Sequence, residues 1–144
     1  MTKTTCNAVQ FRFARPTDKL GEVIRFYHEG VGLPVIGSFH DHDGYDGIML
    51  GLSGSTCHIE FTSHVSGSPC PAPTNDNLLV LYFDDTDKYN SALERLNGYG
   101  YLPVQPENPY WLDKSKTFED PDGWRVVLFN GIYQAPADNI ASPS

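Results

Sequence analysis

His58 and Glu60 are residues whose types and spacing could do chemistry. They lie two positions apart in an apolar stretch typical of a β-strand, and side chains at i and i+2 of a strand share one face. A glutamate in a groove is a candidate general base that could move a proton next to a carbonyl group. We therefore identify Glu60 as the candidate catalytic residue and His58 as a candidate ligand-binding residue.

Two arginines, Arg12 and Arg125, each interrupt an apolar strand and are candidate cations for Glu60. A guanidinium in such a strand either faces a groove, where it could bind an anionic or carbonyl ligand, or forms an ion pair on the solvent side of the sheet. Both interpretations stay open for each arginine, and Phe11 and Phe13 compete with Arg12 for core-facing positions. We take both arginines as ligand-binding candidates.

Aromatic side chains form a second group of candidates. Tyr110 and Trp111 lie in a loop whose two prolines restrict the backbone. They either form a wall that stacks on a flat ligand or cap the core beneath the loop. Tyr82, in an apolar strand, is a further ligand-binding candidate.

The histidines and cysteines predict no familiar metal site. His40 and His42 are also two residues apart, but a pair at a strand end is more often a solvated turn than a ligand set. The three cysteines lack Cys-X-X-Cys spacing, so neither a zinc knuckle nor a disulfide framework is indicated. We expect no cofactor. The alternative is a divalent metal such as Zn, Ni or Fe.

The elements that must position these residues occur twice. The tripeptide at 17–19 returns at 86–88, and the tripeptide at 33–35 returns at 102–104, both at an offset of 69. Between the matches, each copy has apolar residues at i, i+3, i+4 and i+7, the spacing of an amphipathic helix. Threonines at 17 and 86 stand where helix N-caps are expected.

Each copy is predicted to be strand–helix–strand–strand–strand. The expected strands are 9–13, 33–39, 47–52, 56–62, 78–83, 102–104, 116–119 and 124–130. The expected organisation is a first module at 8–65, a Pro- and Ser-rich linker at 66–76, a second module at 77–130 and a loose or strap-like tail at 131–144.

Composition excludes several classes of function. The chain has 144 residues, 40% of them hydrophobic, and a net charge of −8, which repels nucleic acid and anionic lipid. No apolar run is long enough for a membrane span, and the first residues lack a signal-peptide pattern. With three cysteines, an odd number, the chain is expected to be a reduced, cytoplasmic protein, and its charge predicts no nucleic-acid or membrane partner.

The duplicated modules resemble the vicinal oxygen chelate superfamily, which includes glyoxalase I, extradiol dioxygenases, fosfomycin-resistance transferases and bleomycin-resistance binding proteins. The matching segments are 18–33, 57–61 and, above all, 118–128 with its Asp-Pro-Asp-Gly turn. The resemblance implies an α+β fold in which two paired βαβββ modules form a curved mixed sheet around a small-molecule groove, with the helices on the outer face. One fold hosts many reactions, so function needs separate support.

Enzymes of this superfamily place four metal ligands, one on the first and one on the last strand of each module. Glu60 matches one of these positions, and Gln10 is the one conceivable ligand near a second. Leu78 and Val127 occupy the other two and cannot coordinate a metal. The resemblance therefore implies a metal-independent member that either binds a ligand or performs acid–base chemistry with Glu60.

Two alternatives from the same resemblance stay open. One is a metal-dependent lyase, isomerase or dioxygenase that uses displaced ligands such as Gln10, His58 and Glu60. The other is a drug-sequestering protein of the bleomycin-resistance type. Such proteins commonly form homodimers, and a charge of −8 suits a cationic drug.

Overall fold

Residues 4–136 are described by the computed structural model of the chain, and they form two successive sets of helices and strands. The first set is β1 (Arg12–Pro16), α1 (Leu20–Ile24), the π-helix η1 (Arg25–Val31), β2 (Val35–His42), β3 (Tyr45–Gly51) and β4 (His58–His64). The second set is β5 (Leu78–Phe83), α2 (Thr86–Gly98), the 3-10 helix η2 (Pro109–Leu112), β6 (Ser115–Glu119) and β7 (Arg125–Asn130). Residues 137–144 of the expected tail lie outside the described residues.

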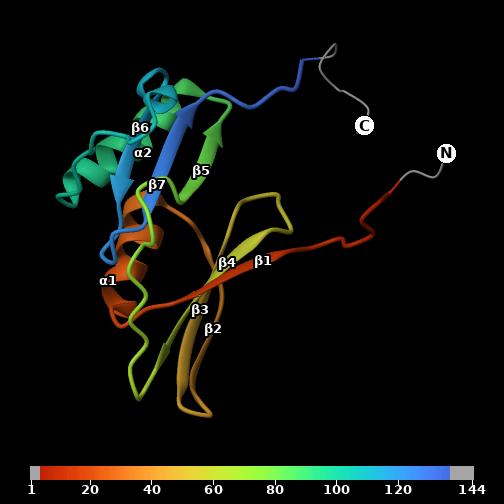
Figure 1. The fold of residues 1–144 in the computed structure, drawn as a ribbon, viewed down its shortest axis with the longest axis vertical. Coiled ribbons are helices and arrows are strands. Elements are labelled where there is room, and N and C mark those ends of the chain that lie inside the picture. Colours follow the sequence, from red (N-terminus) through yellow and green to blue (C-terminus); the bar gives the residue numbers. More distant parts are fainter. Residues whose placement is uncertain (1–3, 137–144) are drawn as a thin grey trace.

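Each set of elements forms its own sheet (Figure 1). Sheet A has the order β1-β4-β3-β2, with β1 parallel to β4 and the other pairs antiparallel. Sheet B has the order β5-β7-β6, with β5 parallel to β7 and β6 antiparallel to it. In both sheets the strand before the helix pairs in parallel with the last strand of its module. The predicted α+β class with two modules is confirmed.

Most expected strands differ from the observed ones by one to three residues at their ends, and two of the differences have a clear physical reason. The first strand begins at Arg12 rather than residue 9, because β4 begins at His58, directly beside Arg12, and offers no ladder partner before it. The expected strand at 102–104 is reduced to a single bridge between Val104 and Thr117. Prolines on both sides of Val104 have no N–H group to continue a ladder.

The first helix buries the face that its spacing predicts, with Val23 and Tyr27 inside the core. Beyond Ile24 the helix continues as the π-helix η1, and it ends at Gly32, whose φ of 96° is a left-handed conformation that favours glycine. Gly30 packs closely against Leu96 of α2. The two modules are therefore held together through their helices.

The N-cap of the second helix differs from the expectation. Thr86 is the first helical residue, and the carboxylate of Asp85 accepts hydrogen bonds from the backbone N–H groups of Asp87 and Lys88. A carboxylate at this position satisfies free N–H groups and also complements the helix dipole, so it caps better than a threonine hydroxyl. The Thr17 hydroxyl does accept the N–H of Lys19, but α1 begins later, with no side-chain cap.

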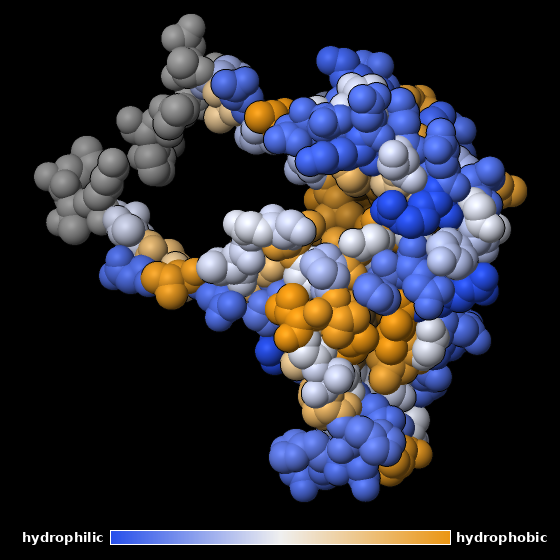
Figure 2. All heavy atoms as spheres, turned by 180° about the vertical axis from the view of Figure 1, so that it is seen from behind, coloured by the Kyte–Doolittle hydropathy of each residue, from blue (hydrophilic) through white to orange (hydrophobic). Residues whose placement is uncertain are grey.

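One hydrophobic core joins the two modules. It contains residues of α1, η1 and α2 together with the helix-facing sides of both sheets, including Leu50, Phe61, Phe118 and Val126. Figure 2 shows other hydrophobic side chains at the surface. No helix within residues 4–136 is long and apolar enough to cross a membrane.

Candidate functional site

Sheet A has two different faces near its parallel pair of strands. Arg15 and Phe61 point toward the helices, where both are buried. Arg12, His58 and Glu60 lie on the opposite face, which no helix covers, because residues alternate between the faces of a strand. The structure therefore brings together three of the residues that the sequence selected. We call them the open-face cluster.

The open-face cluster is held by contacts to the Arg12 guanidinium. Its Nε donates a hydrogen bond to Nε2 of His58 at 2.9 Å, and its Nη1 lies 3.3 Å from Oε2 of Glu60. Because Nε2 of His58 accepts, the neutral ring carries its proton on Nδ1, a buried atom that has no hydrogen-bond partner among the described residues. The Glu60 side chain is 14% exposed and that of Arg12 45% exposed, so the guanidinium forms the outer part of the cluster.

The neighbouring strand β3 borders the cluster with apolar groups. Gly51 pairs with His58 and Met49 pairs with Glu60 on the same face. A side chain at Gly51 would press on Ile36, which leans over it from β2. The polar cluster therefore has an apolar border, an arrangement typical of small-molecule sites.

The aromatic candidates gather on sheet B instead. Tyr82 and Tyr110 line one cavity with Phe129 and Tyr133, and the cavity has a volume of about 530 Å³. Tyr82 lies 5.5 Å from Phe129, measured between ring centroids, and Trp111 packs edge-on against Tyr110 at 4.8 Å. Phe129 and Tyr133 were not selected from the sequence. Phe129 belongs to an apolar strand typical of a buried core, and Tyr133 belongs to the segment expected to be a tail.

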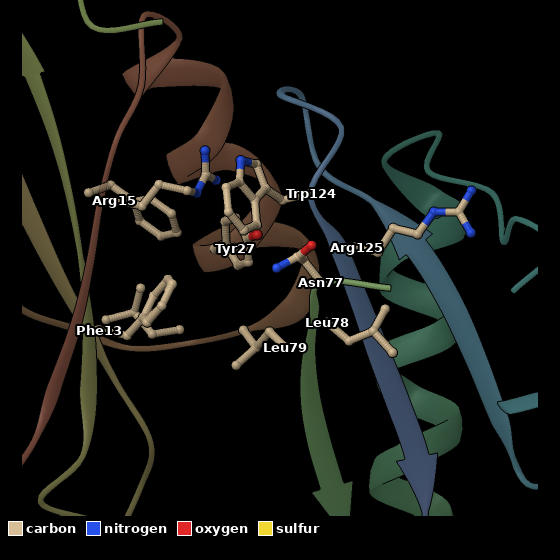
Figure 3. A pocket seen from close by; sticks show the side chains of 10 residues that line it. Phe13, Arg15, Tyr27, Asn77, Leu78, Leu79, Trp124 and Arg125 are labelled. Atoms are coloured by element: carbon tan, nitrogen blue, oxygen red, sulfur yellow. The ribbon is translucent and has the colours of Figure 1, made fainter. Parts of the chain in front are cut away.

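Arg125 forms its polar contacts within the second module. Its Nη1 donates to the carbonyl of Gln105 at 2.9 Å, and its Nε lies 3.5 Å from the carboxylate of Glu119. The side chain extends away from the other labelled side chains in Figure 3. The structure does not bring Arg125 to Glu60. The side chain forms an ion pair, but it is 8% exposed rather than directed to solvent, and it also lines a cavity between the two modules.

A second cavity lies between the two modules, with a volume of about 180 Å³ (Figure 3). Its wall is mostly aromatic and aliphatic and contains Phe13, Tyr27, Phe61, Leu78, Leu79 and Trp124. Asn77 brings an amide group to it. The lining includes Leu78 but neither Glu60 nor Val127, so this cavity does not bring the three expected ligand positions together.

A buried ionic network adjoins this cavity, and sequence reasoning missed it. The Arg15 guanidinium contacts Asp120 at 2.5 Å and Asp122 at 2.9 Å, and it lies over the rings of Phe61 and Trp124. It joins β1 to the Asp-Pro-Asp-Gly turn, two segments more than a hundred residues apart. The signal was the pair of aspartates in that turn.

Tyr27 completes the network. Its hydroxyl donates to Oδ2 of Asp120 at 2.7 Å. Burial raises the pKa of Tyr27 well above its ordinary value, and the charge of Asp120 adds to the effect. Burial also raises the pKa of Asp120, although Tyr27, Arg15 and two backbone N–H groups oppose the shift. The network is therefore an enclosed connection between modules, distinct from the solvent-facing open-face cluster.

The donors around Glu60 do not fit a divalent metal. Its carboxylate and the accepting nitrogen of His58 are both directed at the Arg12 guanidinium, which repels a cation. Val127 is fully buried and Leu78 is apolar. Within residues 4–136 there is no group of three His, Cys, Asp or Glu side chains that could hold a metal ion.

Comparison with protein families gives two matches that follow one another along the chain. Residues 11–62 match the YycE-like N-terminal domain, and residues 76–130 match the YycE-like C-terminal domain. The YycE protein of Bacillus subtilis (strain 168), which is uncharacterized, is 48% identical over 123 residues, covering 85% of this chain and 88% of that protein.

Solved structures give the same grouping. The crystal structure of Bacillus subtilis YycE, described as a protein of unknown function and grouped with glyoxalase and fosfomycin resistance proteins, matches with a TM-score of 0.82 and 46% identity, over 89% of this chain and 93% of that one. TnmS3, an antibiotic binding protein from Streptomyces sp. CB03234, matches with a TM-score of 0.62 and 22% identity, over 90% of this chain and 100% of that one. The fosfomycin resistance protein FosX of Mesorhizobium loti matches with a TM-score of 0.66 and 15% identity, over 89% of this chain and 94% of that one. The last two show a shared fold.

Proposed function

The chain belongs to the YycE-like family within the vicinal oxygen chelate superfamily, and from this premise we propose that it binds a small organic molecule on the open face of sheet A without a metal. The observation that carries the proposal is the open-face cluster of Arg12, His58 and Glu60. A permanent cation, an imidazole and a carboxylate with an apolar border offer a ligand both charge complementarity and an apolar contact.

Acid–base chemistry is the reaction that these side chains support best. The Glu60 carboxylate would take a proton from the carbon next to a carbonyl group, and the electron pair of that C–H bond would move into the carbonyl. The resulting enolate oxygen would accept an N–H of Arg12, which stabilises the developing negative charge. In a hydroxyketone, transfer of the neighbouring hydroxyl proton to the enolate oxygen and return of the proton from Glu60 to the former carbonyl carbon complete an isomerisation, so no redox cofactor is needed.

Proton exchange tests this proposal directly. A panel of 2-oxo acids and hydroxyketones in D₂O should show enzyme-dependent loss of α-proton signals by NMR. Glu60→Gln should slow the exchange by about 100-fold or more, the usual contribution of a general base, while ligand binding persists. Glu22→Gln, which removes an exposed carboxylate on α1, is the matched control and should exchange like the wild type.

The outcomes separate the candidate functions. Exchange that is unchanged in Glu60→Gln contradicts the role of Glu60. If a compound binds but its α-protons do not exchange, the function is sequestration of that compound rather than catalysis. That second candidate is supported by the aromatic cavity at Tyr82, Tyr110 and Phe129, by the net charge of −8 and by the fold shared with an antibiotic binding protein.

The cellular location belongs to the same proposal. Cys6, Cys57 and Cys70 are all free thiols. Free thiols suit a reducing compartment, which supports a cytoplasmic location. Fractionation of cells that express the tagged full chain would test this.

A further inference from the structure

The position of Arg12 carries an inference about how this chain works without a metal. In the parallel pair β1–β4, Arg12 lies directly beside His58, and Ala14 lies beside Glu60. The alanine leaves room for the longer Arg12 side chain to run across to Glu60. Arg12 is thus the first-strand residue that reaches the glutamate of the last strand.

The two potential metal donors of this face are already engaged by that side chain. The lone pair of His58 Nε2 accepts from Arg12 Nε, and Oε2 of Glu60 faces Arg12 Nη1. A guanidinium stays charged at all accessible pH values, so a dication approaching the same two donors would meet a fixed like charge. The two donors therefore face a cation that belongs to the protein chain, the Arg12 guanidinium, instead of a bound metal ion.

We propose that the Arg12 guanidinium takes the place of the divalent cation in this chain, neutralising Glu60 and offering its remaining N–H groups to an oxygen of the ligand. The second part of this proposal, the binding of a ligand oxygen, rests on the proposed function, and the first part does not. A guanidinium is planar and binds two oxygens side by side, so the ligand class that fits is a carboxylate or an enolisable 2-oxo acid. The partly exposed Arg12 side chain is accessible to such a ligand.

A single substitution tests the replacement. Arg12→His would set a second imidazole beside His58 and Glu60, giving two histidines and one carboxylate on adjacent strands, a set of donors that suits several divalent transition metals. Zn²⁺ titration of metal-free protein by calorimetry should then show one site that binds at least 100-fold more tightly than any Zn²⁺ binding by the wild type. The double variant Arg12→His/Glu60→Gln should lose this gain.

Two further variants serve as controls. Lys116→His adds a histidine on the exposed side of β6 and should bind Zn²⁺ no better than the wild type. Arg12→Lys keeps the positive charge and should gain no site. Circular dichroism checks that each variant is folded, and Arg12→Cys, which also adds a side chain that binds Zn²⁺, replaces Arg12→His if the latter unfolds.

The results divide clearly. One equivalent of Zn²⁺ on the wild type that disappears in Glu60→Gln overturns the inference, and so does a folded Arg12→His that binds no more tightly than Lys116→His. Binding of 2-oxo acids should fall at least tenfold in Arg12→Lys and stay unchanged in Lys116→His. If the metal results hold but no 2-oxo acid binds the wild type, the proposed function fails and the cation replacement stands.

Discussion

Arg15 shows how different the roles of two neighbouring arginines of one strand can be. Arg12 faces the open side of sheet A, whereas Arg15, on the other face, is 4% exposed and neutralised by two aspartates. The sequence drew attention to Arg12 because it interrupts apolar residues. Arg15 stands next to Pro16 at the end of the strand, where an arginine usually reaches solvent, so its burial could not be predicted without knowing what covers it.

Tyr27→Phe tests the network at its most enclosed hydroxyl. The substitution removes the hydrogen bond to Asp120 and should lower the free energy of unfolding by about 2 kcal/mol, the usual value for a hydrogen bond to a charged group. Chemical denaturation at pH 7 measures the difference. Tyr133→Phe, at an exposed tyrosine, should change stability by much less.

The same pair of proteins gives a pH test. Because the folded-state pKa of Tyr27 is raised above the unfolded value, its contribution to stability is complete below about pH 10 and is lost as the pH rises toward the folded pKa. The stability difference between wild type and Tyr27→Phe should therefore be constant from neutral pH to about pH 9 and shrink above pH 10. A difference that grows at alkaline pH would contradict the raised pKa.

The candidate site was partly predictable residue by residue. The i, i+2 spacing correctly placed His58 and Glu60 on one face, because alternation is a property of any strand. The partner on the first strand was uncertain, since the bounds of that strand decide between Gln10 and Arg12, and hydrophobicity does not fix them. Arg125 lies in another module's ion pair, which only the packing of β6 on β7 reveals.

At the scale of elements, sequence periodicity predicts the helices and most strands but not their ends. Both helices bury the predicted apolar faces, whereas the π-helical continuation of α1 has no sequence signature of its own. The cap of α2 shows the same limit. Aspartate is the stronger N-cap, but Asp85 and Thr86 are adjacent, and the repeat of the Thr17 tripeptide at Thr86 favoured the wrong residue.

Asp85→Ala and Thr86→Ala form a matched pair of substitutions. Asp85→Ala removes the acceptor for two backbone N–H groups and should lower the free energy of unfolding by about 1 kcal/mol. Thr86→Ala leaves those hydrogen bonds intact and should have less than half that effect. Urea denaturation of both variants measures this difference. A larger loss of stability in Thr86→Ala would show that Thr86, not Asp85, is the N-cap.

The linker between the modules is fixed rather than loose. The Ser68 hydroxyl accepts the N–H of His64 at 2.7 Å, and its own N–H donates to the Asp18 carboxylate. Further along, the indole N–H of Trp124 donates to the carbonyl of Cys70 at 2.8 Å. The linker therefore contributes to the relative placement of the modules even though it enters no sheet.

At the scale of the whole molecule, the surface suggests a second copy as partner. β1 and β5 each pair on one side only, and near them Val9, Phe11 and Phe13 are 55–87% exposed. Exposed sheet edges next to apolar side chains commonly mark interfaces. We therefore expect a homodimer in solution.

Sedimentation velocity would measure this assembly. Phe11→Glu places a charge in the exposed apolar segment and should shift the protein toward the monomer, weakening association at least tenfold. Leu102→Glu, at an equally exposed leucine, should leave the dimer intact. A wild type that sediments as a monomer at all concentrations would remove the expectation.

The contact between Arg15 and Asp120 spans 105 residues of chain and has a consequence for synthesis. A ribosome adds roughly 5–20 residues per second, so Arg15 emerges about 5–20 seconds before its partner. During that interval the first module holds an unneutralised guanidinium where the finished protein is dry. The nascent first half should therefore keep this guanidinium in contact with water until the final hairpin leaves the exit tunnel.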